Sequence, residues 1–339
     1  MKRLGVALLG AGRMGQEHAK ALAGIPPARV VAVADPREEA RERAAYLAKA
    51  ERTYADAREA IEDPEVEAVV IVTPTATHAE LIEAAARAGK AVFSEKPVAL
   101  DLEATERALA AVKEAGTPFQ IGFQRRYDAG YRRARRLLDE GAVGQVDQFR
   151  AVGRDPAPPP LAYLRTSGGL FLDMAIHDFD LARFLIGEVE SVQAYGTVRV
   201  DPRIGEIGDV DTAITLLFFQ NGAQGVVENS RRAAYGYDIR TEVFGERGKL
   251  VVDAVPKTPT WYYREGGLEA DHYHFFMDRF AQAYRAELAA FVEAVNQGKE
   301  PTPGPEDALG SLLIALAATQ SWKEGRRVAL KEVRNGASL

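Results

Sequence analysis

Leu4–Gly15, with the sequence LGVALLGAGRMG, is the stretch that decides the fold of the first third of the chain. Its mostly apolar beginning predicts a buried strand, and Gly10–Gly15 follows as G-x-G-x-x-G in front of a predicted helix. Asp35 ends the next predicted strand, twenty residues after Gly15. In such a loop the glycines let the backbone approach a pyrophosphate, and the helix N-terminus supplies N–H donors. The segment therefore predicts a dinucleotide site.

Further short apolar runs follow this stretch, separated by alanine-rich segments with helical periodicity. The runs are continuous, as is typical of parallel strands buried on both faces. They comprise Val30–Ala34, Ala68–Thr73, Ala91–Ser94 and Pro118–Phe123. One intervening helix is predicted from an N-cap at Asp101 to Ala115, before Gly116. Repeated βα units predict a Rossmann-type, doubly wound α/β domain over residues 1–122.

After residue 123 the sequence changes to longer strands with partial alternation. Asn221-Gly222 between two of them predicts a two-residue hairpin turn. Helices are predicted at Gly168–Leu185, Met277–Asn296 and Pro305–Lys323. The expected strands are Gln145–Val152, Ser191–Val200, Asp211–Phe219, Ala223–Ser230, Ile239–Phe244 and Leu250–Ala254. Residues 123–339 are therefore expected to form an α+β domain on one open antiparallel sheet.

The composition excludes several classes of function. The net charge of −6 argues against nucleic acid or an anionic membrane as the main partner. The chain of 339 residues has no cysteine, which removes disulfides, thiolate nucleophiles and cysteine-ligated zinc. No apolar run reaches the roughly 18 residues that would span a membrane, and the N-terminus leads directly into a predicted strand. A cytoplasmic location is expected.

The choice of cofactor depends on Asp35. Its carboxylate is expected to accept hydrogen bonds from the adenosine ribose hydroxyls and to repel a 2′-phosphate, which favours NAD. Arg37 follows two residues later and offers a partner for that phosphate, so NADP is the less favoured alternative.

Lys96, in Ser94-Glu95-Lys96-Pro97, follows the fourth predicted strand. Ligands bind at the carboxyl edge of an open α/β sheet, where a lysine can donate to the oxygen of a hydroxyl or carbonyl group. An exposed lysine in a surface loop is the alternative.

Asp173, His177 and Asp180 lie at i, i+4 and i+7 of a predicted helix and share one side of it. The pattern is compatible with a solvated face, a metal site, or a catalytic base with its orienting carboxylate. The presence of Lys96 and of the cofactor loop in the same chain favours the third interpretation. Of the six arginines between residues 125 and 136, Arg125 or Arg126 is expected to reach the site, and the others to form a solvated helix face or intersubunit ion pairs.

Several of these motifs, in this order along nearly the whole chain, resemble the glucose–fructose oxidoreductase / inositol dehydrogenase (Gfo/Idh/MocA) family. They are Gly10–Gly15, Val72-Thr73-Pro74, Glu95-Lys96-Pro97 and Gly168-Gly169 with Asp173 and His177. Within the family the chain looks most like inositol 2-dehydrogenases. The segments that carry this likeness are Gly122–Asp128, Arg154–Pro158, Met174–Asp180 and Tyr235–Asp238.

The resemblance implies a role for each site residue. Lys96, Asp173 and His177 form the catalytic group, without a metal. The residues implied to bind the cofactor are Gly10, Gly12, Arg13, Met14, Asp35, Thr73, Pro74, Glu95 and Lys96. Those implied to bind substrate are Lys96, Arg126, Asp155, Asp173, His177, Asp180 and Tyr235, with Tyr237 as the alternative tyrosine.

The implied activity is NAD-dependent oxidation of a ring hydroxyl of a cyclic polyol, most of all myo-inositol to 2-keto-myo-inositol, by a homotetramer. The sequence leaves open which of Lys96 and His177 takes the proton. Alternatives are a dehydrogenase of another sugar or of scyllo-inositol, a non-catalytic cofactor-binding regulator, and a metal-dependent lyase or isomerase.

Overall fold

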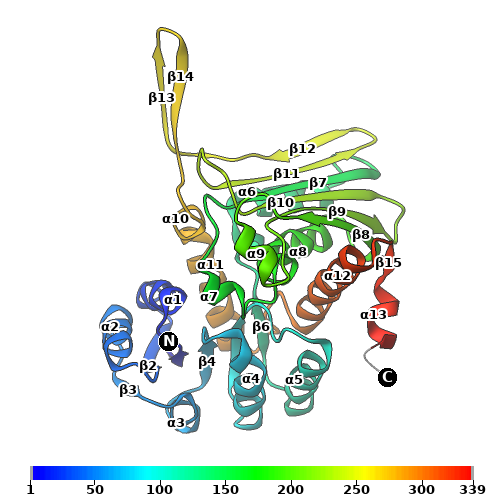
Figure 1. The fold of residues 1–339 in the computed structure, drawn as a ribbon. Helices are drawn as coiled ribbons and strands as arrows, with labels where there is room; N and C mark the ends of the chain where they lie inside the picture. The colour runs from blue at the N-terminus through cyan, green and yellow to red at the C-terminus, as the bar shows by residue number, and fades with distance from the viewer. Residues whose placement is uncertain (1–2, 337–339) are drawn as a thin grey trace. The chain divides into compact units, whose positions relative to one another are not determined.

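The computed structural model describes residues 3–336, which form two compact units (Figure 1). The first unit comprises the chain up to Tyr127 together with Gln282–Gly310, and the second comprises Asp128–Ala281 and the chain from Ser311 onward. A single boundary after residue 122 is predicted from the sequence. The division in the structure differs because Gln282–Gly310 belongs to the N-terminal unit. Within residues 3–336, no helix is long and apolar enough to cross a membrane.

A six-stranded parallel sheet forms the centre of the first unit, with the strand order β3-β2-β1-β4-β5-β6. This is the order of a doubly wound dinucleotide-binding fold, so the predicted α/β domain is confirmed. Every residue of β1 and β4 is buried, which explains their continuous apolar sequences. The strands are β1 (Leu4–Leu9), β2 (Ala28–Ala34), β3 (Arg52–Tyr54), β4 (Ala68–Ile71), β5 (Ala91–Glu95) and β6 (Phe119–Gly122).

Helices connect these strands and cover the sheet. In α5 (Leu102–Ala115), the Asp101 carboxylate accepts a hydrogen bond from the Ala104 N–H, and Gly116 ends the helix with φ of 62°. Both ends of this helix are therefore where the capping residues predict them. The other helices are α1 (Arg13–Ala23), α2 (Glu38–Ala48), α3 (Ala57–Glu62), α4 (His78–Arg87) and the 3₁₀ turns η1 (Thr75–Thr77) and η2 (Gln124–Tyr127).

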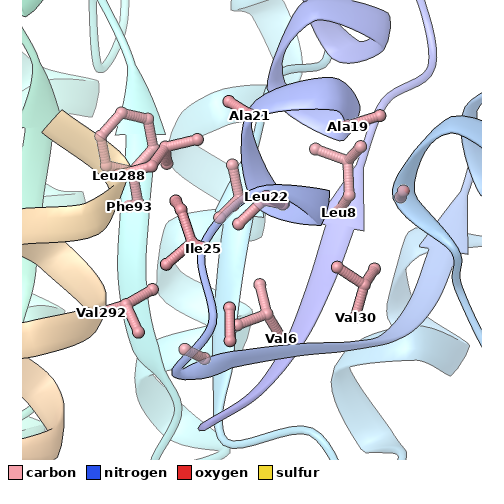
Figure 2. Packing of buried hydrophobic residues seen from close by; sticks show 14 of the residues in the cluster. Val6, Leu8, Ala19, Ala21, Leu22, Ile25, Val30, Phe93, Leu288 and Val292 are labelled. Atoms are coloured by element: carbon pink, nitrogen blue, oxygen red, sulfur yellow. The ribbon is translucent and has the colours of Figure 1, made fainter. Parts of the chain in front are cut away.

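A helix from the far end of the chain completes the core of the first unit. Leu288 and Val292 of α11 (Ala281–Asn296) lie in the same buried cluster as Leu22, Ile25 and Phe93 (Figure 2). Burying such side chains stabilises the fold by about 1.5–3 kcal/mol each. The apolar face of α11 is therefore the reason why Gln282–Gly310 belongs to this unit.

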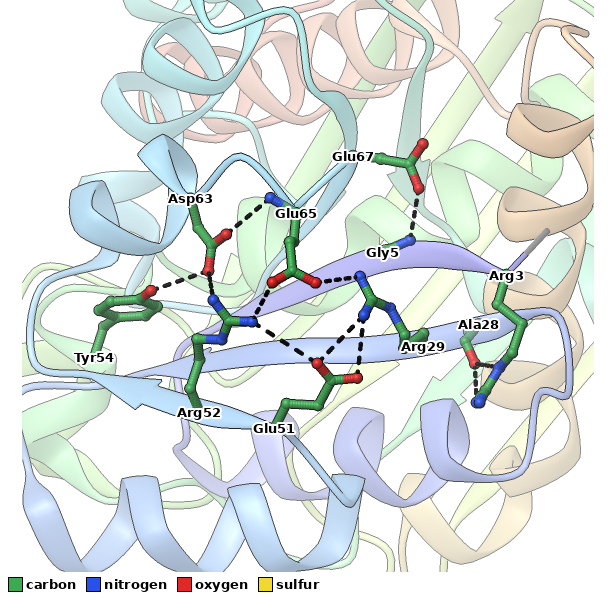
Figure 3. Close-up of polar contacts among 10 residues, drawn as sticks. All are labelled: Arg3, Gly5, Ala28, Arg29, Glu51, Arg52, Tyr54, Asp63, Glu65 and Glu67. Carbon is green, nitrogen blue, oxygen red and sulfur yellow. Dashed lines mark hydrogen bonds and ion pairs between the residues drawn. The ribbon is translucent and has the colours of Figure 1, made fainter.

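The short strand β3 was not predicted from the sequence because it has no apolar pattern. Polar contacts hold it (Figure 3): Arg52 donates to Asp63 at 3.1 Å and to Glu65 at 2.6 Å. Arg29 of β2 donates to the same Glu65 at 2.9 Å, and Tyr54 donates to Asp63 at 3.0 Å. Ion pairs at the surface contribute little individually, but this network ties β3 to β2 and to the segment after α3.

The second unit contains a seven-stranded sheet with the order β12-β11-β7-β10-β9-β8-β15. The expected open sheet is confirmed as mostly antiparallel, with one parallel pair, β7 and β10. The strands are β7 (Val146–Arg154), β8 (Val189–Thr197), β9 (Thr212–Phe219), β10 (Gln224–Ser230), β11 (Asp238–Gly245), β12 (Gly248–Val252) and β15 (Val328–Ala329). A separate hairpin, β13 (Pro256–Arg264) and β14 (Gly267–His272), was not predicted and extends from this unit with most of its residues exposed (Figure 1).

Helices contact this sheet on one face. The helices of the second unit include α6 (Ala129–Asp139), which contacts β12, and α8 (Ile176–Leu185), which contacts β7 and β10. The remaining ones are α7 (Leu161–Leu164), α9 (Pro202–Glu206), α10 (Phe276–Arg279), α12 (Pro305–Glu324, in this unit from Ser311) and α13 (Leu330–Gly336).

Candidate active site

The glycine loop between β1 and α1 has the geometry that a pyrophosphate requires. Gly10 has φ of +102°, and a Cβ there would lie 2.6 Å from the Val72 carbonyl oxygen. A Cβ at Gly15 would lie 2.1 Å from the Gly10 oxygen, so both positions require glycine. At Gly12, the N-cap of α1, no side chain caps the helix, and a Cβ would meet only the Arg37 Nη2 atom at 3.8 Å. The N-terminus of α1 is therefore open to an anion, which fits the predicted dinucleotide.

Arg13 and Met14 form the first turn of α1 behind this loop. Arg13 is exposed, whereas Met14 is partly buried and packs against the hydrophobic cluster of the first unit.

Asp35 follows β2 and supports the loop. Its Oδ2 atom accepts a hydrogen bond from the Ala11 N–H at 2.7 Å, and its Oδ1 atom accepts from the Arg37 N–H at 2.9 Å. The Arg37 guanidinium lies 3.2 Å from Oδ1. Burial by itself raises the pKa of Asp35, but the hydrogen bonds from Arg37 and Ala11 outweigh it and hold this pKa below the ordinary value. Asp35 is thus an anion at neutral pH, and Arg37 is engaged with it.

A buried histidine joins two loops at the carboxyl edge of the parallel sheet. The Nε2 atom of His78 lies 2.8 Å from the carbonyl oxygen of Thr73, and its Nδ1 atom lies 2.8 Å from that of Pro97. Thr73 and Pro74 follow β4, whereas Pro97 follows β5. Burial lowers the pKa of His78, and the two carbonyl contacts oppose this effect without overcoming it. His78 therefore fixes the segment after Lys96.

The segment before Lys96 is fixed by a second buried histidine. His18 of α1 has no exposed surface, and its Nε2 atom lies 2.7 Å from the Glu95 Oε1 atom. The other oxygen, Oε2, accepts a hydrogen bond from the Lys96 N–H at 3.3 Å. Burial by itself raises the pKa of Glu95. The hydrogen bond and charge of His18 lower this pKa by more than burial raises it, so the net shift is downward. Glu95, expected to bind cofactor, directs its carboxylate to His18 and to the main chain of Lys96.

Arg126 lies in η2, where the side chain of Asp307 orients it. Its Nη2 atom donates to the Asp307 Oδ1 atom at 2.8 Å, while Oδ2 accepts from the Gly304 N–H at 3.0 Å. Asp307 lies in α12, far along the chain, and was not recognised from the sequence. A guanidinium held in this way has a fixed orientation, as a binder of hydroxyl groups requires.

In the second unit, Asp173 lies on a π-helical turn, η3 (Phe171–Ala175), which continues into α8. The predicted continuous α-helix from Gly168 is wrong in its first turn, because Gly168 and Gly169 have φ of +84° and +86°. π-helical turns are common at functional sites. The Asp173 Oδ2 atom accepts from the Arg231 guanidinium at 3.1 Å, and Oδ1 accepts from the Tyr163 hydroxyl at 2.7 Å.

The polar stripe that contains Asp173 is not a solvated face. Asp180 is 1% exposed and accepts from the Ser311 hydroxyl at 3.4 Å, and His177 is only partly exposed. Within residues 3–336, no group of three His, Asp or Glu side chains is arranged to hold a metal ion. Buried polar groups without a solvent role favour the interpretation of a chemical site.

The other expected substrate-binding residues of the second unit lie after strand ends. Asp155 follows β7, and its N–H donates to the Ser230 oxygen at 2.9 Å. Tyr235 is about half exposed, and its hydroxyl donates to Asp238 at 2.6 Å. Tyr237 is buried against Phe280. The two tyrosines do not alternate along a strand, because Gly236 between them has φ of +118° in a turn.

Each of the two units contains a region that matches a known protein family. The family described as "Oxidoreductase family, NAD-binding Rossmann fold" matches residues 4–123, and the GFO/IDH/MocA C-terminal domain matches residues 131–251. The chain belongs to the Gfo/Idh/MocA oxidoreductase family. It is therefore an NAD-binding oxidoreductase.

The similarity to individual Gfo/Idh/MocA proteins extends over nearly the whole chain. A myo-inositol 2-dehydrogenase of Thermotoga maritima is 44% identical over 97% of this chain and 99% of its own. An NAD⁺-dependent scyllo-inositol 2-dehydrogenase of Bacillus subtilis is 40% identical over 96% of this chain and 95% of its own. The structure of Lactobacillus casei scyllo-inositol dehydrogenase with NAD(H) and scyllo-inositol has a TM-score of 0.92 at 32% identity, covering 97% of this chain and 100% of that one.

Proposed function

We propose that this protein oxidises a ring hydroxyl of an inositol with NAD, and that its preferred substrate is myo-inositol, converted to 2-keto-myo-inositol. The observation that carries the proposal is the full-length similarity to inositol 2-dehydrogenases, at 44% identity to that of Thermotoga maritima. The chain retains Lys96, Asp173 and His177, the catalytic group that the family resemblance implies. This retention distinguishes a dehydrogenase from a regulator that only binds the cofactor.

In the proposed reaction, His177 removes the proton of the substrate hydroxyl, and the carboxylate of Asp173 stabilises the charge that His177 acquires. Lys96 donates to the same substrate oxygen, stabilises the developing alkoxide and then polarises the ketone. Bound NAD supplies the acceptor for the hydride that leaves the ring carbon.

The preference for NAD over NADP is assigned to Asp35. This residue is ionised, as its lowered pKa requires, and a 2′-phosphate beside it would meet like charge. Arg37, which would otherwise neutralise that phosphate, is paired with Asp35 at 3.2 Å.

The assignment of a polyol rests on the mix of donors and acceptors. Arg126, Asp155 and Asp180, with a tyrosine, suit a ring that carries a hydroxyl on every carbon. A carboxylated substrate would call for a paired arginine clamp with few acids nearby. Buried carboxylates left without partners penalise analogues that lack hydroxyls, so cyclohexanol is expected to be a very poor substrate.

The test compares kcat/KM for myo-inositol, scyllo-inositol and D-glucose with NAD, monitored at about 340 nm. Myo-inositol is expected to be used best. Scyllo-inositol is the second candidate, because the relatives from Bacillus subtilis and Lactobacillus casei are scyllo-inositol dehydrogenases. A tenfold preference for glucose would reject the inositol assignment and leave the dehydrogenase assignment intact.

We also propose a homotetramer in which the open face of the seven-stranded sheet packs against another subunit. Tyr195 and Ile214 are exposed on this face, beside the partly exposed Leu216, Phe218 and Val226. Such an apolar surface favours a subunit contact.

The sequence pattern predicts that Leu216, Phe218, Val226 and Val243 share this face, and the prediction is wrong for Val243. Val243 is 1% exposed because it lies opposite Phe149 of β7 on the buried face, and Phe244 is the exposed neighbour. Light scattering at micromolar concentration tests the proposed tetramer, and a monomer would refute it.

A further inference from the structure

We infer that Arg231 and Tyr163 are positioning residues that fix the carboxylate of Asp173 for the reaction. The inference rests on the proposed function, because it assigns a role to Asp173 in the chemistry. Neither residue belongs to the catalytic group or the substrate-binding set that the family resemblance implies. Both act on the substrate only through Asp173.

Arg231 is the first of the two supports. Its side chain is 1% exposed, and its Nη2 atom lies 3.1 Å from the Asp173 Oδ2 atom. In the described part of the chain, Asp173 is the acidic residue with which Arg231 forms an ion pair. The position of Arg231 directly after β10 is set by its N–H, which donates to the Asp211 oxygen at 2.8 Å. A buried guanidinium is costly unless it is paired, so this contact holds both partners in place.

Tyr163 is the second support and comes from a different element. It lies in α7, and its hydroxyl donates to the Asp173 Oδ1 atom at 2.7 Å. The side chain is 46% exposed, so its apolar ring is not a central part of the core. Each oxygen of the Asp173 carboxylate thus has its own donor. Together the two donors prevent rotation of the carboxylate about its terminal torsion, which is otherwise soft.

The backbone beneath Asp173 is held as well. The N–H of Leu170 donates to the Asp209 Oδ1 atom at 3.0 Å, and the N–H of Asp173 donates to the Gly169 oxygen at 2.9 Å. The π-helical turn therefore starts from a fixed point. With the backbone fixed, the donors Arg231 and Tyr163 determine the orientation of the Asp173 carboxylate.

The chemical consequence concerns the transition state more than binding. A carboxylate whose two oxygens are each held by a donor keeps one orientation, so it can stabilise charge that develops on His177. Loss of either donor would misplace this negative charge, and a displacement of about 1 Å in a catalytic group can cost about 10²-fold in rate. Such a loss lowers kcat and leaves KM nearly unchanged.

The test uses the Tyr163→Phe, Arg231→Met and Arg231→Lys variants of the full chain with NAD and myo-inositol. We measure kcat, KM and the isotope effect on kcat with substrate deuterated at the carbon that loses hydride. Tyr163→Phe is expected to lower kcat about tenfold, and Arg231→Met about 10²-fold, with KM changed by less than about threefold. The isotope effect should rise, because the chemical step becomes slower than product release. Arg231→Lys keeps the cation and should recover part of the loss.

Tyr46→Phe is the matched control, because Tyr46 of α2 is an exposed tyrosine, at 84%, that belongs neither to the proposed site nor to the proposed subunit contact. If kcat and the isotope effect of Tyr163→Phe equal those of the unmodified protein, as they should in this control, the inference is overturned. The proposed function still stands in that case, provided that the unmodified protein oxidises myo-inositol with NAD. If Arg231→Met does not fold, Tyr163→Phe still decides. A wild-type protein that oxidises no polyol with NAD would instead reject the proposed function itself.

Discussion

Lys96 and Asp173, which lie in different units of the chain, are held in different ways. Around Lys96, in the first unit, the structure fixes the main chain. His78 lies between the Thr73 and Pro97 oxygens, and Glu95 is bound by His18 while it accepts from the Lys96 N–H. These contacts place the segment that carries the lysine, and they act without touching its ammonium group.

Around Asp173, in the second unit, the structure fixes the functional group itself. Arg231 and Tyr163 each donate to one carboxylate oxygen. An aspartate is short enough for both of its oxygens to be held by donors from neighbouring elements, as they are here. These contacts thus fix the orientation of a carboxylate at Asp173 and the position of the main chain around Lys96.

The largest effect on activity is expected from replacing Lys96, the functional side chain of the segment after β5. Lys96→Ala should lower kcat by about 10²–10⁴-fold, because the donor to the substrate oxygen is lost. The main-chain contacts around residue 96 remain, so NADH should still bind, as measured by fluorescence titration. Loss of NADH binding with kcat preserved would show that Lys96 serves the cofactor and not the reaction.

Replacing His18 tests how much its contact with Glu95 contributes to the stability of the protein. His18→Phe keeps the ring packing against Phe93 and Tyr284 but removes the imidazole that pairs with the Oε1 atom of Glu95. Breaking such a buried pair is expected to cost about 3 kcal/mol of the free energy of unfolding, measured with urea.

The double variant His18→Phe/Glu95→Gln is the control for this prediction. It removes the uncompensated charge and should be more stable than His18→Phe alone. Equal stability of the two variants would mean that the contact between His18 and Glu95 is not an ion pair.

Replacing the histidine after the loop gives a smaller loss with a distinct pH dependence. His78→Asn should destabilise the protein by about 1–3 kcal/mol at neutral pH, because a buried carbonyl loses its donor. Burial lowers the pKa of His78, so the unfolded state binds a proton first as the pH falls below about 6.5. Wild-type stability should therefore decrease below this pH.

In His78→Asn this part of the pH dependence should disappear. Urea unfolding between about pH 5.5 and pH 8 measures it. His274→Asn, at an exposed position, is the matched control. An unchanged pH dependence in His78→Asn would contradict a neutral, buried His78.

The smallest effect concerns the choice of cofactor. Asp35→Ser should weaken NAD binding and raise the relative use of NADP by about 10–100-fold, since charge-assisted hydrogen bonds are lost and Arg37 no longer has Asp35 as its partner. The ratio of kcat/KM for the two cofactors measures this change. A wild-type preference for NADP would show that Arg37, and not Asp35, selects the cofactor.

The sequence predicted the elements that have a strong local pattern. β1 matches its apolar run residue for residue, and α5 ends at its capping residues. β3 was missed because it is short and polar. The β13–β14 hairpin was missed because both of its faces are mostly exposed, so its sequence does not alternate.

The residues that support the site could not be predicted for a different reason. Lys96 and Asp173 stand in recognisable motifs, but their supports come from distant positions. Arg231 lies 58 residues from Asp173, and His18 lies 77 residues from Glu95. Only the fold brings such pairs together, and no local spacing encodes them.

The position of Gln282–Gly310 has a consequence for protein engineering. The polypeptide passes between the two units three times, after Tyr127, before Gln282 and after Gly310. A fragment that ends near residue 127 would lack α11 and would expose the apolar surface that Leu288 and Val292 cover, which favours aggregation. A chimera that exchanges the substrate unit with that of a relative therefore needs two inserted segments, and Gln282–Gly310 must stay with the parent that supplies the glycine loop.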